Sequence, residues 1–249
     1  MRLIDTRTLA MRESVSDIPP YAILSHTWGS EEVTSQNYHK AFSLTGSNLV
    51  HMPGAGYAKI GGLCSRARQR GLGWAWIDTC CIDKTSSAEL SEAINSMWNW
   101  YRHSAVCFAF LGDVEPTSTI APSDLESDEL SATYRLQFRT SRWFTRGWTL
   151  QELIAPQFVE FLARDWSEVG TKRSLVKSLV DSTGIRRCVL ESPWEVASLS
   201  VAERMRWVGD RETTRQEDIA YCLFGIFGVT SPYSAARAIV PSFDSKKRS

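Results

Sequence analysis

The chain has 249 residues, of which 43% are hydrophobic and 22% charged, and its formal net charge is zero. This composition excludes a disordered chain and predicts one large α/β domain, or one domain with a helical extension. A chain without net positive charge lacks the overall attraction to nucleic acid or to an anionic membrane, so we expect neither partner.

The six cysteines predict buried free thiols rather than a metal site. None falls in a Cys-x-x-Cys pair, and no closely spaced histidine pair accompanies them. Most stand among apolar residues, which is typical of a reducing compartment. The N-terminal sequence does not resemble a signal peptide, and no apolar run approaches the roughly 20 residues that span a bilayer. We therefore expect a cytoplasmic location, with no metal and no membrane partner.

The first half of the chain alternates short apolar runs with helical patterns, which is the signature of an α/β sheet. A helix is predicted at residues 57–70 from the spacing of its apolar side chains. A second helix begins after Ser86, because Ser86 and Glu89 form a capping-box pattern. Strands are predicted at residues 21–26, 74–78 and 105–111.

The second half begins with polar, Pro- and Ser-rich residues, 113–135, which predict a long surface loop. A short helix carrying Trp148 and Glu152 follows, ends near Pro156 and leads into a strand at 158–162. From about residue 168 the pattern is mostly helical. Two further helix starts are predicted from capping-box pairs, Ser200/Glu203 and Thr214/Glu217.

This order of elements, joined by right-handed crossovers, predicts a doubly wound, mostly parallel, flavodoxin-like sheet with a C-terminal helical extension. Ligands of such sheets bind beyond the carboxyl ends of the strands. Those ends hold Ser25, His26 and Asp78, and then the loop that leads to Trp148 and Glu152. We expect four regions: an N-terminal segment 1–20, an α/β core 21–167, a helical part 168–230 and a flexible tail 231–249.

Glu152 is the candidate catalytic residue. It stands four residues after Trp148, so the two share one helix face. A ring beside a carboxylate suits a flat cation attached to a sugar, such as the nicotinamide end of NAD+, whose cleavage passes through an oxocarbenium-like state. Nicotinamide leaves as a neutral molecule, so one carboxylate would suffice without a general acid. The alternative is that Glu152 faces solvent on an amphipathic helix.

The remaining candidates are substrate-binding residues, each with a structural alternative. Ser25, His26 and Trp28 would line the loop after the first strand, or be ordinary turn and loop residues. Asp78 would orient a ribose, or cap the turn that follows it. Arg146 would pair with a ligand phosphate, with a nearby acid, or with solvent.

A rival mechanism uses a cysteine nucleophile. Cys80 or Cys81, with His26 as the base, would make a thiol hydrolase. Both cysteines lie in an apolar segment, which favours inert buried thiols instead. The sequence contains no GxGxxG, Walker, GxSxG or HExxH motif, which argues against the usual dehydrogenase, NTPase, esterase and zincin classes.

Several blocks resemble, in order and spacing, the fungal heterokaryon incompatibility (HET) domain. They include "YAILSHTW", "WAWIDTCCIDK", "RWFTRGWTLQELIAP" and "ERMRWVGDRETTRQEDIAYCLFGIFGV", and the resemblance runs from about residue 21 to residue 229. Proteins of this family are associated with programmed cell death when genetically different fungal cells fuse. After "GIFGV" the chain departs from the family's usual apolar, Gly-containing continuation.

The family in turn resembles Toll/interleukin-1 receptor (TIR) domains, which implies a TIR-like fold. "GWTLQEL" is similar to the Trp-x-x-x-Glu segment of NAD-consuming TIR domains, where the Glu is catalytic. The resemblance therefore implies an NAD+ glycohydrolase in which Glu152 is catalytic and Trp148 stacks on the ring. It implies NAD+ as substrate, with NADP+ as a second candidate, no cofactor, self-association on activation and a separate trigger protein. The alternative is a non-enzymatic homotypic signalling module in the same pathway.

Overall fold

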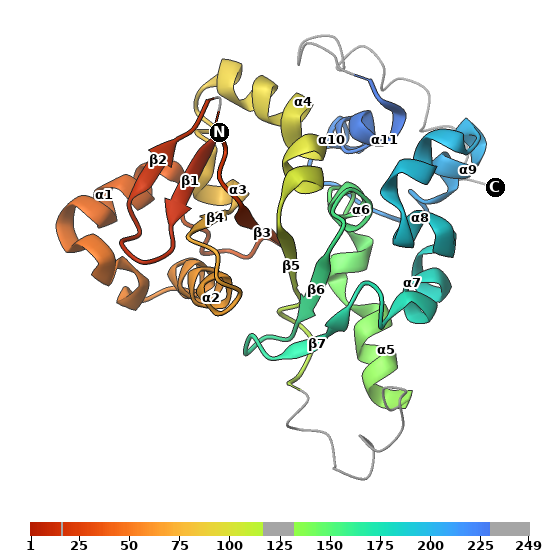
Figure 1. Cartoon of the computed structure of the whole chain (residues 1–249), viewed down its shortest axis with the longest axis horizontal. Coiled ribbons are helices and arrows are strands. Elements are labelled where there is room, and N and C mark those ends of the chain that lie inside the picture. Colours follow the sequence, from red (N-terminus) through yellow and green to blue (C-terminus); the bar gives the residue numbers. More distant parts are fainter. Residues whose placement is uncertain (16, 117–131, 230–249) are drawn as a thin grey trace.

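The computed structural model describes residues 1–15, 17–116 and 132–229. A seven-stranded mixed sheet runs through the molecule in the order β2-β1-β4-β3-β5-β6-β7, with helices on both sides (Figure 1). The strands are β1 (Arg2–Asp5), β2 (Met11–Glu13), β3 (Tyr21–His26), β4 (Trp74–Trp76), β5 (Val106–Phe110), β6 (Val159–Leu162) and β7 (Glu168–Thr171).

The centre of the sheet is parallel and its edges are antiparallel. Strands β4, β3, β5 and β6 pair in parallel, while β1 and β2 on one side and β7 on the other pair antiparallel to their neighbours. All six residues of β3 are buried, as expected for a central strand covered on both faces. The prediction of an α/β fold with a doubly wound, parallel centre is therefore confirmed.

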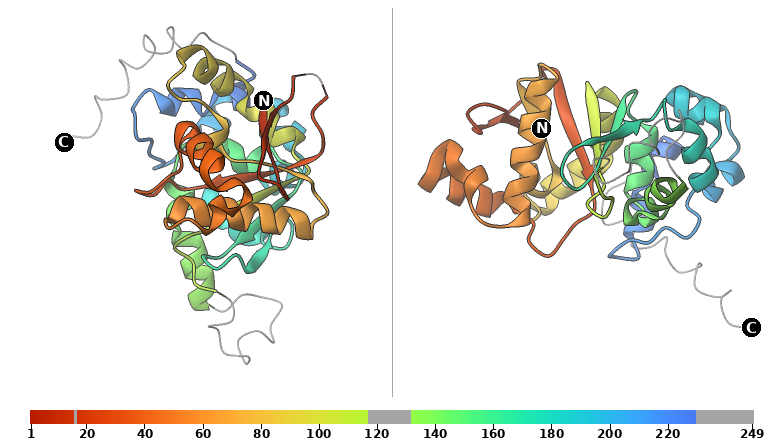
Figure 2. Two further views of the ribbon diagram at one scale, coloured as in Figure 1. Left: turned by 90° about the vertical axis from the view of Figure 1, so that its left-hand side faces the viewer. Right: turned by 90° about the horizontal axis from the view of Figure 1, so that it is seen from below.

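The helices surround this sheet as two layers. α2 packs against β3 and β4, while α6 packs against β3 and α4 on the opposite side (Figures 1 and 2). The α-helices are α1 (Ser35–Thr45), α2 (Ala55–Gln69), α3 (Asp78–Cys81), α4 (Ser87–His103), α5 (Ala132–Thr140), α6 (Thr149–Ile154), α7 (Val176–Thr183), α8 (Arg187–Glu191), α9 (Val201–Arg206), α10 (Asp218–Tyr221) and α11 (Phe224–Phe227). Short 3-10 turns are η1 (Gly46–His51), η4 (Arg142–Thr145) and η5 (Pro193–Ser198).

Two of the predicted helix starts are confirmed by their caps. The Ser86 hydroxyl accepts the Glu89 amide at 3.3 Å, and the Ser200 hydroxyl accepts the Glu203 amide at 3.2 Å. The third prediction, at Thr214, is wrong. α10 begins at Asp218 without a side-chain cap, and the Thr214 hydroxyl accepts from a distant arginine instead.

Other local predictions also needed correction. β7 lies where a helical pattern was expected, because its pairing with β6 stabilises four residues that have little strand character alone. β4 ends at Trp76, and Asp78 opens the short helix α3 instead of ending the strand. The predicted loop 113–135 lies largely outside the described residues, and α5 begins within it at Ala132.

The regional boundaries differ from those expected at both ends of the core. Residues 1–20 contribute β1 and β2 to the sheet, so this segment is an integral part of the fold. β7 likewise extends the sheet past residue 167. The expected tail 231–249 lies outside the described residues.

Candidate functional site

The candidate site lies at the carboxyl ends of the parallel strands. β3 has β4 on one side and β5 on the other, and the chain crosses over between them, so the strand order reverses here. Ligands of open α/β sheets bind at such a reversal. Ser25 and His26 end β3, Asp78 follows β4, and Glu152 comes from α6, which precedes β6.

Glu152 is buried and hydrogen-bonded. Its relative exposure is 8%, and all six residues of α6 are buried. The Ser25 hydroxyl donates to its carboxylate, and the Trp143 indole Nε1 donates to the Ser25 oxygen at 2.8 Å. Ser25 and Trp143 are themselves fully buried. The expected alternative, a solvent-facing Glu152, is therefore contradicted by the structure.

The environment of Glu152 favours its protonated form. Its pKa is raised to about 8, chiefly by burial and also by the nearby Asp78 charge, while the Ser25 hydrogen bond acts in the opposite direction. The Tyr101 hydroxyl is a near neighbour, but its single proton goes to the Leu24 carbonyl at 2.9 Å. We therefore assign the hydrogen bond that orients the carboxylate to Ser25.

A segment from the C-terminal half holds the N-terminal end of α6. Arg211 Nη1 donates to the Arg146 carbonyl at 2.8 Å and to the Thr149 hydroxyl at 2.9 Å. The Gly147 amide donates to the Glu212 carbonyl at 2.9 Å. Burial lowers the Arg211 pKa to about 10, and its charge favours ionisation of the carboxylate on α6. The helical extension is thus part of the site's framework.

His26 lies between two carboxylates. Its Nε2 is 3.6 Å from Glu32 Oε2, and its Nδ1 is 3.9 Å from Asp78 Oδ1. Burial alone would raise the Glu32 pKa, but the His26 contact, the Gly29 amide and Lys59 outweigh it and lower that pKa to about 2. Glu32 is therefore an anion at neutral pH, and the Lys59 ammonium forms an ion pair with it.

Trp28 forms the exposed rim of the site. The residue is 50% exposed, and its Nε1 donates to Asp78 Oδ2 at 3.0 Å. The Lys84 ammonium lies 3.4 Å from the ring centroid and 3.3 Å from the same carboxylate oxygen. The Trp28 ring therefore already makes a cation–π contact, and a positively charged aromatic ligand would bind the ring by the same kind of contact.

The structure brings together some of the predicted residues and separates others. Ser25 contacts Glu152, and both His26 and Trp28 contact Asp78. Trp148 instead packs beside the cluster of Ile94, Tyr221 and Phe224, and its indole is hydrogen-bonded to Asp218. Arg146 donates to the Thr214 hydroxyl at 2.8 Å. Both residues thus hold the C-terminal segment against α6.

Sequence reasoning missed four residues that shape the site: Trp143, Arg211, Lys84 and Glu32. Trp143 and Lys84 stand inside the quoted blocks "RWFTRGWTLQELIAP" and "WAWIDTCCIDK", where attention to the other polar and aromatic residues could have found them. Arg211 also stands inside a quoted block, but its contacts are made with residues near α6, which are distant in sequence. Glu32 lies outside the quoted blocks, and it contacts both His26 nearby and Lys59 farther along the chain.

The cysteine alternative has no geometric support. Cys80 and Cys81 are buried, and burial raises the pKa of Cys80 well above its usual value. Within the described residues, neither thiol hydrogen-bonds His26, and no cluster of three His, Cys, Asp or Glu side chains could hold a metal ion. No helix in the described ranges is both long and apolar enough to cross a membrane.

Comparisons with known proteins agree with the blocks seen in the sequence. The family profile described as "Heterokaryon incompatibility protein (HET)" matches residues 21–152. The chain is 45% identical over 218 residues to Vegetative incompatibility protein HET-E-1 of Podospora anserina, a match that covers 86% of this chain and 15% of that protein. No solved structure matches the chain. The family match and this degree of identity show that the chain belongs to the heterokaryon incompatibility (HET) family.

Proposed function

We propose that the chain hydrolyses NAD+ at the bond between nicotinamide and ribose, as a cytoplasmic cell-death effector in heterokaryon incompatibility. The observation that carries the proposal is the buried Glu152 carboxylate, fixed by the Ser25 hydroxyl at the carboxyl ends of the parallel strands. The relative's name, a vegetative incompatibility protein, supports the biological setting.

The proposed chemistry needs one anion close to the ribose. When nicotinamide departs, positive charge develops on the sugar, and a carboxylate beside it lowers the energy of that state. A charge in a buried site acts more strongly than one in water. Glu152 would supply this anion, Ser25 would fix its orientation, and the Trp28 face would accept the cationic ring in place of the Lys84 ammonium.

Protonation of Glu152 is part of the proposed mechanism. With a pKa of about 8, the group holds a proton at neutral pH in the free chain. A nicotinamide cation placed beside it favours the ionised form, so substrate binding would release that proton. We therefore expect kcat/KM to rise with pH until it levels off above about pH 8.

Access to Glu152 requires a change in the site. The residue is 8% exposed, and it is absent from the walls of a cavity of about 670 Å³ and of another of about 330 Å³ in the described part of the chain. We propose that self-association, prompted by a separate trigger protein, opens or completes the site. The same burial favours a second candidate function, a non-enzymatic homotypic signalling module in which the Glu152 hydrogen bond is structural.

The test is nicotinamide release from NAD+, and from NADP+, by the purified chain over a wide range of protein concentrations. Glu152→Gln is the informative variant, because the amide keeps the size and the acceptor oxygen for Ser25 but cannot carry negative charge. We expect release by the wild type to rise more steeply than linearly with concentration, and release by Glu152→Gln to vanish.

Glu13→Gln is the matched control, since Glu13 is an exposed carboxylate on β2. It should release nicotinamide at the wild-type rate. If the wild type is inert even when clustered on a scaffold, the signalling module becomes the better reading. Activity that survives Glu152→Gln would instead refute the assigned role of Glu152.

A further inference from the structure

A cavity of about 670 Å³ lies at the opposite edge of the sheet from Glu152. Its walls include Val106 and Val159, the first residues of β5 and β6, so it opens at the amino ends of the parallel strands. This volume falls in the range of small-molecule sites. We propose that the cavity binds a small amphipathic anion, with a flat apolar body and one carboxylate, sulfonate or phosphate group.

Apolar side chains on one side of the cavity wall indicate that part of the ligand is apolar. Leu72, Val106, Val159 and Leu190 line the cavity. Phe158, also in the wall, is 64% exposed, which is unusual for a large aromatic side chain. A flat apolar ligand would cover this ring and gain from the removal of both surfaces from water.

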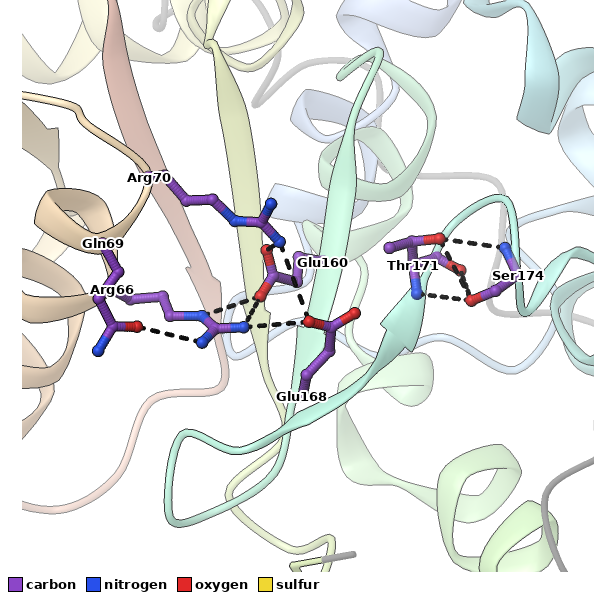
Figure 3. A network of polar contacts seen from close by, with 7 residues as sticks. All are labelled: Arg66, Gln69, Arg70, Glu160, Glu168, Thr171 and Ser174. Atoms are coloured by element: carbon purple, nitrogen blue, oxygen red, sulfur yellow. Dashed lines mark hydrogen bonds and ion pairs between the residues drawn. The ribbon is translucent and has the colours of Figure 1, made fainter. Parts of the chain in front are cut away.

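The acidic groups of the wall are already paired with arginines. Figure 3 shows Arg66 and Arg70, at the end of α2, directed toward Glu160 on β6, which is 2% exposed. Arg66 Nε donates to Glu160 at 2.9 Å, and Arg70 forms a second ion pair with the same carboxylate. Arg187 pairs with Glu191 at 2.8 Å. Neither wall carboxylate therefore repels a bound anion strongly.

Two cationic residues of the wall lack such an acidic partner. Arg173 is exposed, and it forms no ion pair with any residue that the structure describes. Lys172 is 4% exposed, and its ammonium donates to the carbonyls of Ile154, at 3.1 Å, and Pro156, at 2.8 Å. Since Arg173 has no acidic partner among the described residues, its guanidinium is available for a charge-assisted hydrogen bond to an anion.

The geometry also limits the size and charge of the ligand. An arginine with free donors, next to an apolar wall, suits one anionic group at one end of an apolar body. The paired Arg66, Arg70 and Glu160 leave no continuous basic surface for a polyanion. The proposal therefore excludes nucleic acid and names an aromatic or similarly flat molecule with one anionic group.

The test is fluorescence titration of the folded chain with 8-anilino-1-naphthalenesulfonate, an aromatic monoanion whose emission rises in apolar sites. N-phenyl-1-naphthylamine, a neutral molecule of similar shape, is the comparison probe. Arg173→Gln removes the free cation, and Ala105→Trp fills the cavity from an exposed wall position. Arg139→Gln is the matched control, an exposed arginine on α5 outside the wall.

We expect saturable binding of one sulfonate probe per chain, about tenfold weaker binding in Arg173→Gln, loss of binding in Ala105→Trp, and no change in Arg139→Gln. The neutral probe should bind the wild type more weakly than the sulfonate. The proposal is overturned if the probe does not bind the wild type, if Arg173→Gln and Ala105→Trp both bind as the wild type does, or if the neutral probe binds equally well. None of these results depends on NAD+ hydrolysis.

Discussion

The burial of Glu152 predicts a specific dependence of stability on pH. The carboxyl has a pKa of about 8 in the folded chain, against 4.5 for the ordinary side chain. Between these values the folded chain binds a proton that the unfolded chain releases. Stability from this group is therefore fully present below pH 4.5 and is lost as the pH rises through 8.

The magnitude follows from the two pKa values. Each pH unit inside this window costs about 1.4 kcal/mol, so the whole window costs up to about 5 kcal/mol in the free energy of unfolding. Glu152→Gln has no proton to exchange, and its amide oxygen can still accept from Ser25. We expect this variant to be increasingly more stable than the wild type as the pH rises.

The assay is urea unfolding, followed by tryptophan fluorescence, at intervals from about pH 5 to about pH 9. Taking the difference between wild type and Glu152→Gln removes the contribution of other titrating groups, including Lys172, whose burial lowers its pKa to about 7. Glu13→Gln, with its exposed carboxylate, should run parallel to the wild type. A difference between wild type and Glu152→Gln that stays constant with pH would show that Glu152 is not buried as described.

Three further outcomes test the framework of the site. Ser25→Ala removes the donor to the buried carboxylate, so it should lower stability by about 1–3 kcal/mol and abolish most nicotinamide release. The control is Ser104→Ala, a buried serine whose hydroxyl donates to a backbone carbonyl; it should lower stability by about 1 kcal/mol and leave nicotinamide release intact. Gly147→Ala places a methyl group 2.6 Å from a side chain of the C-terminal segment, so it should lower stability by about 1–3 kcal/mol in thermal unfolding. Gly73→Ala has open space around its new methyl group and should leave the melting point nearly unchanged. Equal melting points for the two variants would contradict the described packing. Arg211→Met removes a buried cation and should move the rise of kcat/KM to higher pH, and an unchanged pH profile would mean that this charge does not act on the carboxylate.

The sequence predicted those elements whose signals are local. The run at 21–26 is mainly apolar and forms β3, and the Ser86 cap predicted the start of α4. These signals are reliable because a buried strand needs apolar residues on both faces, and a helix start needs an acceptor for its free amides. The arrangement of the elements as an α/β sheet follows from their order alone.

The tertiary structure decided what depends on distant partners. β7 has little strand character in sequence and exists because β6 pairs with it. Thr214 fits a capping pattern, but its hydroxyl accepts from Arg146 instead.

Glu152 is the clearest example of this division. Its sequence neighbours are compatible with an exposed helix face as well as with a cleft. The fold buries it because β3 brings Ser25 to its carboxylate, and because Arg211 holds the start of α6 from the far end of the chain. The sequence alone determined which residue types are present and which short elements they form. Only the packing of remote segments fixed the burial and protonation of that carboxylate, since desolvation depends on what surrounds a group in space and not on its neighbours along the chain.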